Sequence, residues 1–248
     1  MRGGPSIWIG FDPREADAFA VCRATILRRH TQPIPVRGLV LEDLQRRGLY
    51  TRPVTRDGGQ LIDVLSRRED YSGAMSTEHA IARFFVPHIA REGWALFTDG
   101  DMLARGNMAR VFERLDPKFA VYCVKHDHRP NSATKMDGQV QTAYPRKNWS
   151  SFMIFNCEHE ANRDLTLAAL NLLPGRDLHR FCWLDDEEIG ELNPAWNFLV
   201  GHSDPAAIPD PQMVHFTEGT PSMPGYEEGL YADEWRRART RWARGREW

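Results

Sequence analysis

The sequence lacks the features that identify several large classes of protein. No apolar run among its 248 residues is long enough to span a bilayer, and residues 1–10 lack the apolar stretch of a signal peptide. Its four cysteines include no Cys-x-x-Cys pair, which argues against a structural zinc site. A hydrophobic share of 42% and a charged share of 27% exclude a fibrous or largely disordered chain. We therefore expect one globular domain in the cytoplasm, with reduced and mostly buried thiols.

Charge is spread unevenly along the chain. The formal net charge of −2 gives no reason to expect nucleic-acid binding. The last 14 residues nevertheless hold six Arg and one Glu, and within them Trp235 and Trp242 are seven positions apart, on one face of a helix. We expect residues 1–234 to form the main domain and residues 235–248 a basic tail. The tail either contacts an anionic membrane surface, peripherally and from the cytoplasmic side, or packs its Trp face on the acidic body.

The order of elements predicts an α/β fold with a largely parallel sheet. Residues 7–11 are an apolar strand candidate, after which Asp12 as cap and Pro13 in the first turn begin a helix. A strand over residues 34–41 and another helix follow, an alternation typical of parallel sheets. Residues 49–73 are polar and contain adjacent glycines, so we expect a mobile loop there. The remaining expected elements are helices over residues 76–93, capped by Ser76 or Thr77, and 162–173, and strands over residues 94–98, 119–124, 152–155 and 213–216.

One short motif points to metal chemistry. Asp99-Gly100-Asp101 follows the buried-strand candidate 94–98, and ligands in open α/β sheets bind beyond the carboxyl ends of strands. Two carboxylates at that edge suit Mn²⁺ or Mg²⁺, which often bridge to phosphate oxygens. The imidazole of His215, on a short apolar strand, is a candidate third ligand. Taken alone, such a pair of Asp residues is more often a solvated turn, and a lone His on a strand is more often structural.

Taken together, the layout resembles that of the family 8-type glycosyltransferases, nucleotide-sugar-dependent enzymes with the GT-A fold. The resemblance extends over most of residues 6–220, and six segments carry it in the family's order: residues 7–12, 76–87, 96–101, 148–156, 183–187 and 213–216. It implies a single Rossmann-like GT-A domain with a mainly parallel central sheet flanked by helices, followed by a short basic C-terminal helix.

The resemblance also implies roles for individual residues. Asp99, Asp101 and His215 would bind Mn²⁺ or Mg²⁺, and the ion would neutralise the leaving diphosphate. Asp185 and Asp186 would act on the donor sugar as the catalytic pair. The implied contacts with the nucleotide sugar come from Gly10, Phe11, Asp12, Arg83, Asp99 and Gly100.

The reaction implied by the resemblance is the transfer of a hexose from a nucleotide sugar, with a UDP-sugar favoured. The acceptor would be a glycan, a lipid-linked saccharide or another molecule, and the anomeric configuration would be retained. Two departures from the family pattern bear on the donor. No Lys follows His215 within residues 217–226, so phosphate contacts must come from elsewhere. The family's Asn-x-Gly core has no Gly here, where Trp149, Ser150 and Ser151 follow Asn148.

Two other functions fit parts of the sequence. In a phosphatase of the haloacid-dehalogenase type, Asp99 would be the nucleophile and Asp101 the general acid, with Asp185 and Asp186 holding Mg²⁺. That interpretation leaves His215 without a role. The second alternative is a non-catalytic module that binds sugar nucleotides. The roles of a few other residues also stay open. The indoles of Trp149 and Trp183 either stack on sugars or pack in the core. Residues 126–128 form either a second metal site or acceptor-contacting loop, or a solvated loop.

Overall fold

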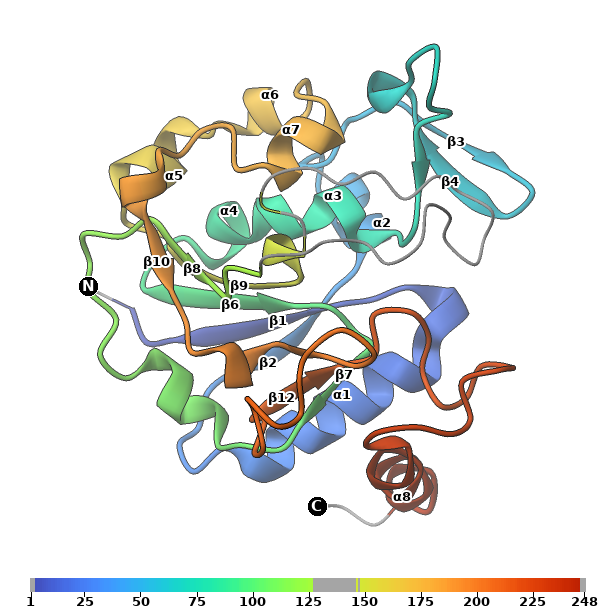
Figure 1. Cartoon of the computed structure of the whole chain (residues 1–248). Helices are drawn as coiled ribbons and strands as arrows, with labels where there is room; N and C mark the ends of the chain where they lie inside the picture. Colours follow the sequence, from blue (N-terminus) through green and yellow to red (C-terminus); the bar gives the residue numbers. More distant parts are fainter. Residues whose placement is uncertain (1–2, 127–145, 147, 246–248) are drawn as a thin grey trace.

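The computed structural model describes residues 3–126, 146 and 148–245. These residues form an α/β domain whose largest sheet has six strands in the order β10-β8-β9-β6-β1-β2 (Figure 1). Three of the five neighbouring pairs are parallel, and β9 is antiparallel to both of its neighbours. The predicted sheet is thereby confirmed. Its strands are β1 (Ser6–Gly10), β2 (Val36–Leu39), β6 (Trp94–Thr98), β8 (Val121–Cys123), β9 (Phe152–Asn156) and β10 (Ile189–Glu191).

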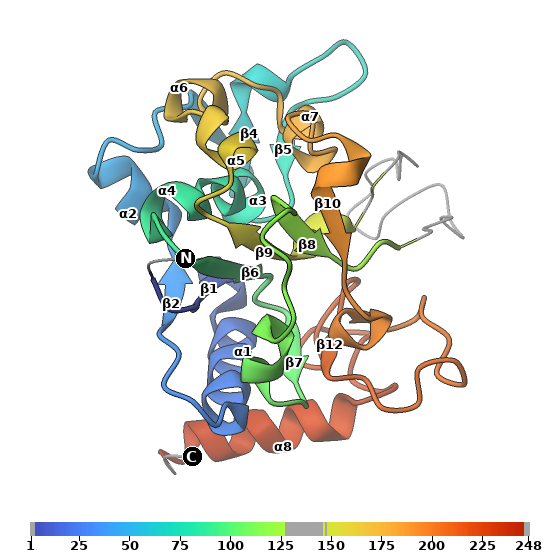
Figure 2. The same cartoon turned by 90° about the vertical axis from the view of Figure 1, so that its left-hand side faces the viewer.

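Helices cover both faces of this sheet (Figures 1 and 2). On one face lies α1 (Ala16–Arg29), which follows the 3-10 turn η1 (Pro13–Glu15). The other face carries α3 (His79–Ala82), η3 (Arg83–Phe85) and α4 (Val86–Ala90). Side chains of β6 alternate between the two cores, with Leu96 on the α1 side and Phe97 on the other. Because both faces are buried, the strand is apolar throughout, as the sequence indicated.

A small second sheet continues from the end of β6. It consists of β11 (Phe198–Leu199), β12 (Met213–His215) and β7 (Met102–Ala104), in that order. The antiparallel pairing of β12 with β7 sets His215 opposite Met102, the residue after Asp101. This register brings the last predicted strand to the aspartate motif.

The C-terminal helix α8 (Ala232–Ala243) lies against α1 and the small sheet (Figure 2). Trp235 is fully buried in a cluster with Val21, Leu103 and Val214. Trp242 is 42% exposed, so the two indoles do not share one packed face. Ion pairs join α8 to the body as well, among them that of Glu234 with Arg105 at 3.0 Å. Packing on the body is thus shown for the first part of this helix. Among the described residues, no helix is long and apolar enough to cross a bilayer.

The prediction of a mobile loop over residues 49–73 was wrong. A hairpin of β3 (Val54–Asp57) and β4 (Gln60–Asp63) occupies this region, and β5 (Ala74–Met75) adds a third strand. The two turn residues, Gly58 and Gly59, have φ of 54° and 84°, which suits the tightest hairpin connection. Arg52 fixes the hairpin to the body: it forms a fully buried ion pair with Asp63 at 2.7 Å and donates to the Leu170 and Leu173 carbonyls at 2.6 and 2.8 Å. Gly58 and Gly59 therefore indicate the turn of a hairpin and not a mobile loop.

Two predicted helices differ in detail from the observed ones. The stretch 162–173 is split into α5 (Glu160–Asp164) and α6 (Leu167–Leu170), because the Thr166 hydroxyl caps a new start by accepting from the Ala169 N–H. The stretch 76–93 is divided into α3, η3 and α4, and neither Ser76 nor Thr77 caps it through its side chain. The other helical segments are α2 (Leu41–Arg46), η2 (Val64–Ser66), η4 (Met108–Phe112), η5 (Trp149–Ser151), α7 (Gly175–His179), η6 (Asp186–Glu188) and η7 (Pro194–Trp196).

Candidate functional site

Three predicted metal ligands meet at the carboxyl end of β6. Asp99 and Asp101 flank the turn between β6 and β7, and His215 ends β12. The Phe216 N–H donates to the Asp101 carbonyl at 3.1 Å, which fixes the end of β12 against this turn. One ligand atom from each of the three side chains lies within 4.8 Å of the others. The sequence prediction that these residues converge is confirmed.

The donor set fits a hard divalent cation. The Oδ1 atom of Asp101 is buried and accepts no hydrogen bond from any described residue, although it lies 3.4 Å from Nε2 of His215. An unpartnered buried carboxylate oxygen is costly unless a cation satisfies it. Two carboxylates and one imidazole suit Mn²⁺, and the carboxylates suit Mg²⁺. The residues present therefore fit the metal that the sequence predicted.

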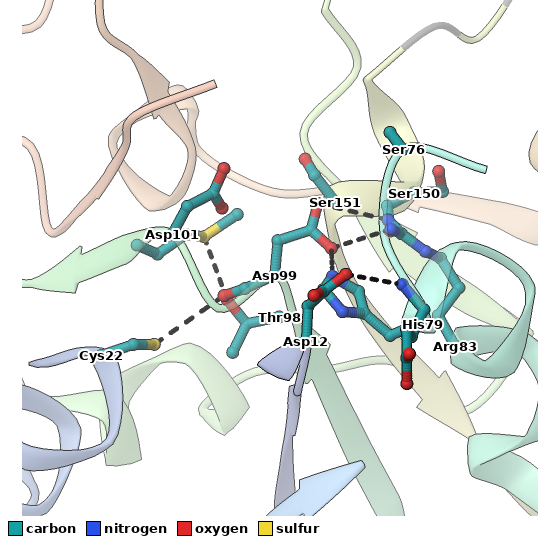
Figure 3. Close-up of polar contacts among 12 residues, drawn as sticks. Asp12, Cys22, Ser76, His79, Arg83, Thr98, Asp99, Asp101, Ser150 and Ser151 are labelled. Atoms are coloured by element: carbon teal, nitrogen blue, oxygen red, sulfur yellow. Dashed lines mark hydrogen bonds and ion pairs between the residues drawn. The ribbon is translucent and has the colours of Figure 1, made fainter. Parts of the chain in front are cut away.

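Asp99 is held by two cationic or hydrogen-bonding side chains. The Nη2 atom of Arg83 lies 2.9 Å from Asp99 Oδ1, and Nε2 of His79 lies 3.1 Å from the same oxygen (Figure 3). Arg83 also donates to the Ser150 carbonyl at 2.8 Å and stands over the Phe97 ring. Burial by itself would raise the pKa of Asp99, but Arg83 and His79 together hold that pKa well below its usual range. The Asp99 carboxylate is thus ionised and fixed in position.

Negative charge gathers on the other side of the turn. Burial raises the pKa of Glu15 to about 7, and the neighbouring Asp101 carboxylate adds to this rise. Burial opposes the charged form of His215, yet Asp101 and Asp99 outweigh it and raise the pKa of that imidazole. The pKa of Glu15 is raised mainly by burial, whereas the raised pKa of His215 reports the two nearby carboxylates of Asp101 and Asp99. The site therefore offers a favourable potential to a cation.

The glycines and Phe11, predicted to contact a nucleotide, have packing reasons for being there. A Cβ on Gly10 would lie 2.4 Å from Cδ2 of His79, and one on Gly100 would lie 2.7 Å from the Gly10 carbonyl oxygen. The ring of Phe11 packs edge-on against Phe19. The ring of His79 therefore requires glycine at residue 10, and the close approach of the β1 backbone requires it at residue 100.

Asp12 caps the turn after β1, as predicted. Its carboxylate accepts from the Arg14 N–H at 2.9 Å and from the Glu78 N–H at 3.0 Å. Burial favours the neutral form, but the bonds from Arg14 and Glu78 outweigh it and lower the pKa of Asp12. Because Glu78 directly precedes α3, the Asp12 carboxylate connects the end of β1 to the helix that carries His79.

The predicted catalytic pair lies on an exposed segment. Asp185 is the N-cap of η6 and Asp186 is its first residue. The Asp185 N–H donates to the Glu188 carboxylate at 3.0 Å, and the Asp186 carboxylate forms an ion pair with Arg146. Both acids are solvent-exposed. The contacts described for Asp185 and Asp186 do not include the three metal-ligand candidates.

The two tryptophans with open roles have defined partners. Trp183 is half-buried, packs edge-on against Phe84 and Phe181, and donates its N–H to Asn162. Core packing, one of its two predicted roles, is therefore shown. Trp149 donates its N–H to the His126 carbonyl at 3.0 Å. Residues 127 and 128 of the loop considered as a second site lie outside the described residues.

Sequence reasoning missed several residues around the metal-ligand candidates. His79 lies in the segment that carried the family resemblance, so its position was a usable signal, whereas Glu15 stands in the first turn after Asp12. Asn197, whose amide oxygen lies 3.2 Å from Nδ1 of His215, has no motif around it. All four cysteines have free thiols, and three of them are buried, as expected.

Comparisons with known proteins place this geometry in context. No family model matches the chain. Protein CDI of Arabidopsis thaliana is 40% identical over 235 residues, which cover 92% of this chain and 83% of that protein. The curated name of that relative states no activity.

Solved glycosyltransferase structures share the fold. The galactosyltransferase LgtC, in complex with donor and acceptor sugar analogues, aligns with a TM-score of 0.58 and 15% identity over 95% of both chains. GlyE of Streptococcus pneumoniae TIGR4 gives 0.57 and 15%, covering 96% of this chain. Mouse xyloside xylosyltransferase 1 gives 0.52 and 12%, covering 87% of this chain and 98% of that one. This chain spans only 61% of GlyE and 52% of the bifunctional glycosyltransferase WbbM. The predicted GT-A-type fold is confirmed by these likenesses.

Proposed function

The chain belongs to the family of Protein CDI of Arabidopsis thaliana, and we propose that it is a metal-dependent glycosyltransferase. The observation that carries this proposal is the meeting of Asp99, Asp101 and His215 at the carboxyl end of β6, with a buried Asp101 oxygen that lacks a hydrogen-bond partner. The likeness of the fold to that of solved glycosyltransferases supports it. We further propose, from the resemblance in the sequence, a family 8-type enzyme that transfers a hexose with retention.

In the proposed enzyme the donor is a nucleotide sugar, with UDP-sugars favoured, and the acceptor is a glycan or lipid-linked saccharide. When bound, Mn²⁺ or Mg²⁺ would supply Lewis-acid stabilisation of the diphosphate leaving group. The chain's own residues hold the ligands for it: Arg83 and His79 fix Asp99, and the pairing of β12 with β7 fixes His215. Site preorganisation of this kind lowers the cost of binding and of charge stabilisation.

The remaining predicted residues have proposed roles in the same enzyme. Gly10 and Gly100 keep the backbone close to the site, where the base and ribose would lie beside Phe11 and Asp12. Arg83 is already occupied by Asp99 and Ser150, so its contribution to the diphosphate is that of a nearby fixed positive charge. With no Lys in residues 217–226, this charge and the cation carry the phosphate contacts.

Asp185 and Asp186 are proposed to act on the donor sugar from η6. Asp185 would accept hydrogen bonds from sugar hydroxyls, and Asp186 would stabilise positive charge that develops at the anomeric carbon. The ion pair with Arg146 restrains the Asp186 carboxylate. These roles require the donor to extend from the aspartate turn to η6.

The cytoplasmic location and the membrane contact of the tail also remain proposals. Supporting the second, the exposed Trp242 lies on α8, which has three exposed arginines: Arg237, Arg239 and Arg241. Residues 1–234 would then form the enzyme and residues 235–248 its basic tail. A mixed Trp and Arg surface is typical of helices that lie on anionic lipid.

The proposal is tested in two steps. Thermal stabilisation is first measured for a panel of UDP- and GDP-sugars with and without Mn²⁺, because a ligand that binds only the native state raises its melting temperature. The stabilising donor is then assayed for Mn²⁺-stimulated release of UDP or GDP. Asp101→Asn should abolish both signals, whereas the matched control Asp70→Asn, at a largely exposed carboxylate, should retain them.

Other outcomes assign the alternatives. Hydrolysis of a simple phosphate monoester without nucleotide would indicate the phosphatase, and donor binding without turnover would indicate the binding module. The structure disfavours the phosphatase, because Arg83 engages both oxygens of Asp99, which does not suit a nucleophile, and because His215 belongs to the cluster. Unchanged Mn²⁺ dependence in Asp101→Asn would show that the metal site is misassigned.

A further inference from the structure

We propose that Asn197 is a positioning residue for His215: it holds the imidazole in the tautomer that points the Nε2 lone pair at the metal site. Asn197 is fully buried, at 0% exposure, and no sequence motif marks it. Its side-chain amide lies between the His215 ring and the hydroxyl of Ser151. The inference deepens the proposed function and rests on its metal site.

The direction of each hydrogen bond follows from one backbone carbonyl. The oxygen of Asn148 can only accept, so the Ser151 hydroxyl donates its proton to it, at 2.8 Å. Ser151 Oγ must then accept from Asn197, whose Nδ2 lies 2.9 Å away. This turns the amide oxygen of Asn197 toward Nδ1 of His215, at 3.2 Å. Because an amide oxygen accepts only, Nδ1 carries the proton.

The other ring nitrogen is thereby left free to bind a cation. In a neutral imidazole with its proton on Nδ1, Nε2 has a lone pair. Nε2 faces the buried Oδ1 of Asp101 at 3.4 Å, and that oxygen accepts no hydrogen bond from the described residues. In the neutral ring two electron pairs then face each other in a buried place, and either a second proton on the ring or a metal ion bound between them removes their repulsion. The hydrogen bonds from Asn148 to His215 thus prepare the site for a metal ion.

The segment of residues 148–151 also positions Asp99 and Arg83. The Ser151 carbonyl accepts from the Asp99 N–H at 2.9 Å, and the Ser150 carbonyl accepts from Arg83 at 2.8 Å. Figure 3 shows both serines beside Arg83 and Asp99. Residues 148–151 are the place where the sequence departs from the family's Asn-x-Gly core.

The tautomer can be read directly by NMR, without any activity assay. Protein labelled with ¹⁵N-histidine is examined by long-range ¹H–¹⁵N correlation, without metal and at a pH where the ring is neutral. The His215 signals are assigned by their absence in His215→Gln. We expect the proton on Nδ1 in the wild type. A proton on Nε2 would overturn the proposal.

Variants separate positioning from a general structural role. Asn197→Leu removes the acceptor, so we expect mixed tautomers and binding of Mn²⁺ alone, followed by EPR, that is weaker by about 10- to 100-fold. Asn197→Asp keeps an acceptor at the same place and should restore both the tautomer and Mn²⁺ binding. The matched control is Asn162→Leu, at an equally buried amide that bonds to the Ala120 and Asn156 carbonyls. It should lose stability but keep the His215 tautomer.

The outcomes distinguish this proposal from the proposed function. Unchanged tautomer and unchanged Mn²⁺ binding in Asn197→Leu would refute the role of Asn197, whatever the enzyme does. Mn²⁺ binding with the expected tautomer but no turnover of any donor would contradict the glycosyltransferase and leave the positioning role intact. If Asn197→Leu does not fold, Asn197→Asp and the wild-type spectrum still decide the tautomer.

Discussion

A side chain at residue 10 and the imidazole of His79 would compete for the same space: a Cβ on Gly10 would lie 2.4 Å from Cδ2 of that ring. Gly10→Ala should therefore displace His79 and weaken its 3.1 Å contact with Asp99. We expect a loss of about 1–3 kcal/mol in the free energy of unfolding, the usual cost of overpacking. Urea denaturation measures it.

Gly4→Ala is the matched control for this substitution, because nothing lies within 4 Å of a Cβ at that position. We expect its free energy of unfolding to change by no more than about 0.5 kcal/mol. Equal losses in both variants would show that the contact with His79 is not what requires glycine at residue 10.

Breaking the buried ion pair of Arg52 and Asp63 should unfold the hairpin region more readily. Asp63→Asn leaves a buried guanidinium without its counter-charge, at a cost of about 3–5 kcal/mol. The double variant Arg52→Met/Asp63→Leu removes both charges and should be less destabilised than the single variant. Arg46→Ala, at an exposed pair, should change stability by at most about 1 kcal/mol. Chemical denaturation of all variants provides the comparison, and a double variant as unstable as Asp63→Asn would contradict the expectation.

Acid should selectively remove the stabilising effect of Asp12. Its hydrogen bonds lower the pKa in the folded state below the unfolded value, so the carboxylate stabilises the fold above that unfolded pKa, near 4. The contribution is lost as the pH falls through the lower, folded-state pKa. The difference in melting temperature between wild type and Asp12→Asn, measured without ligand, should be largest near neutral pH and should shrink below about pH 4. A difference independent of pH would exclude this linkage.

The two tryptophans of α8 should differ sharply in their effect on stability. Trp235→Ala opens a cavity between α8, α1 and the small sheet, at a cost of about 3–5 kcal/mol. Trp242→Ala, at a half-exposed indole, should change stability by no more than about 0.5 kcal/mol. Calorimetric melting of the two variants tests this contrast, and similar losses in both would show that Trp242 also packs on the body.

The sequence predicted the metal-ligand candidates and the sheet best where the functional residues directly follow a recognisable strand. A buried strand followed by Asp99 and Asp101 could be recognised because strand, turn and ligands are contiguous, and His215 because its short apolar strand stands alone. The parallel sheet followed from the alternation of strands and helices. These predictions depend on neighbours in the chain.

What escaped prediction depends on contacts between distant residues. The hairpin at residues 54–63 has an exposed polar surface, and it is attached to the body by Leu61, which packs in the larger core, and by Arg52, which donates to the Leu170 and Leu173 carbonyls. Asn197 acts through Ser151 and His215, which lie far from it in the sequence. Similarly, nothing in the sequence distinguishes Trp235 from Trp242 until α8 is placed on α1. Tertiary partners of this kind cannot be derived from periodicity or from motifs.

A cation shared by Asp99, Asp101 and His215 would act as a cross-link between early and late parts of the chain. A bond between distant segments removes conformations from the unfolded state, as a disulfide does, and the effect grows with the length of the loop that it closes. Strand β12 would be fastened to β6 by the ion in addition to its pairing with β7. Helix α8 packs on the same small sheet through Trp235, so removal of the ion would also loosen the attachment of the C-terminal helix.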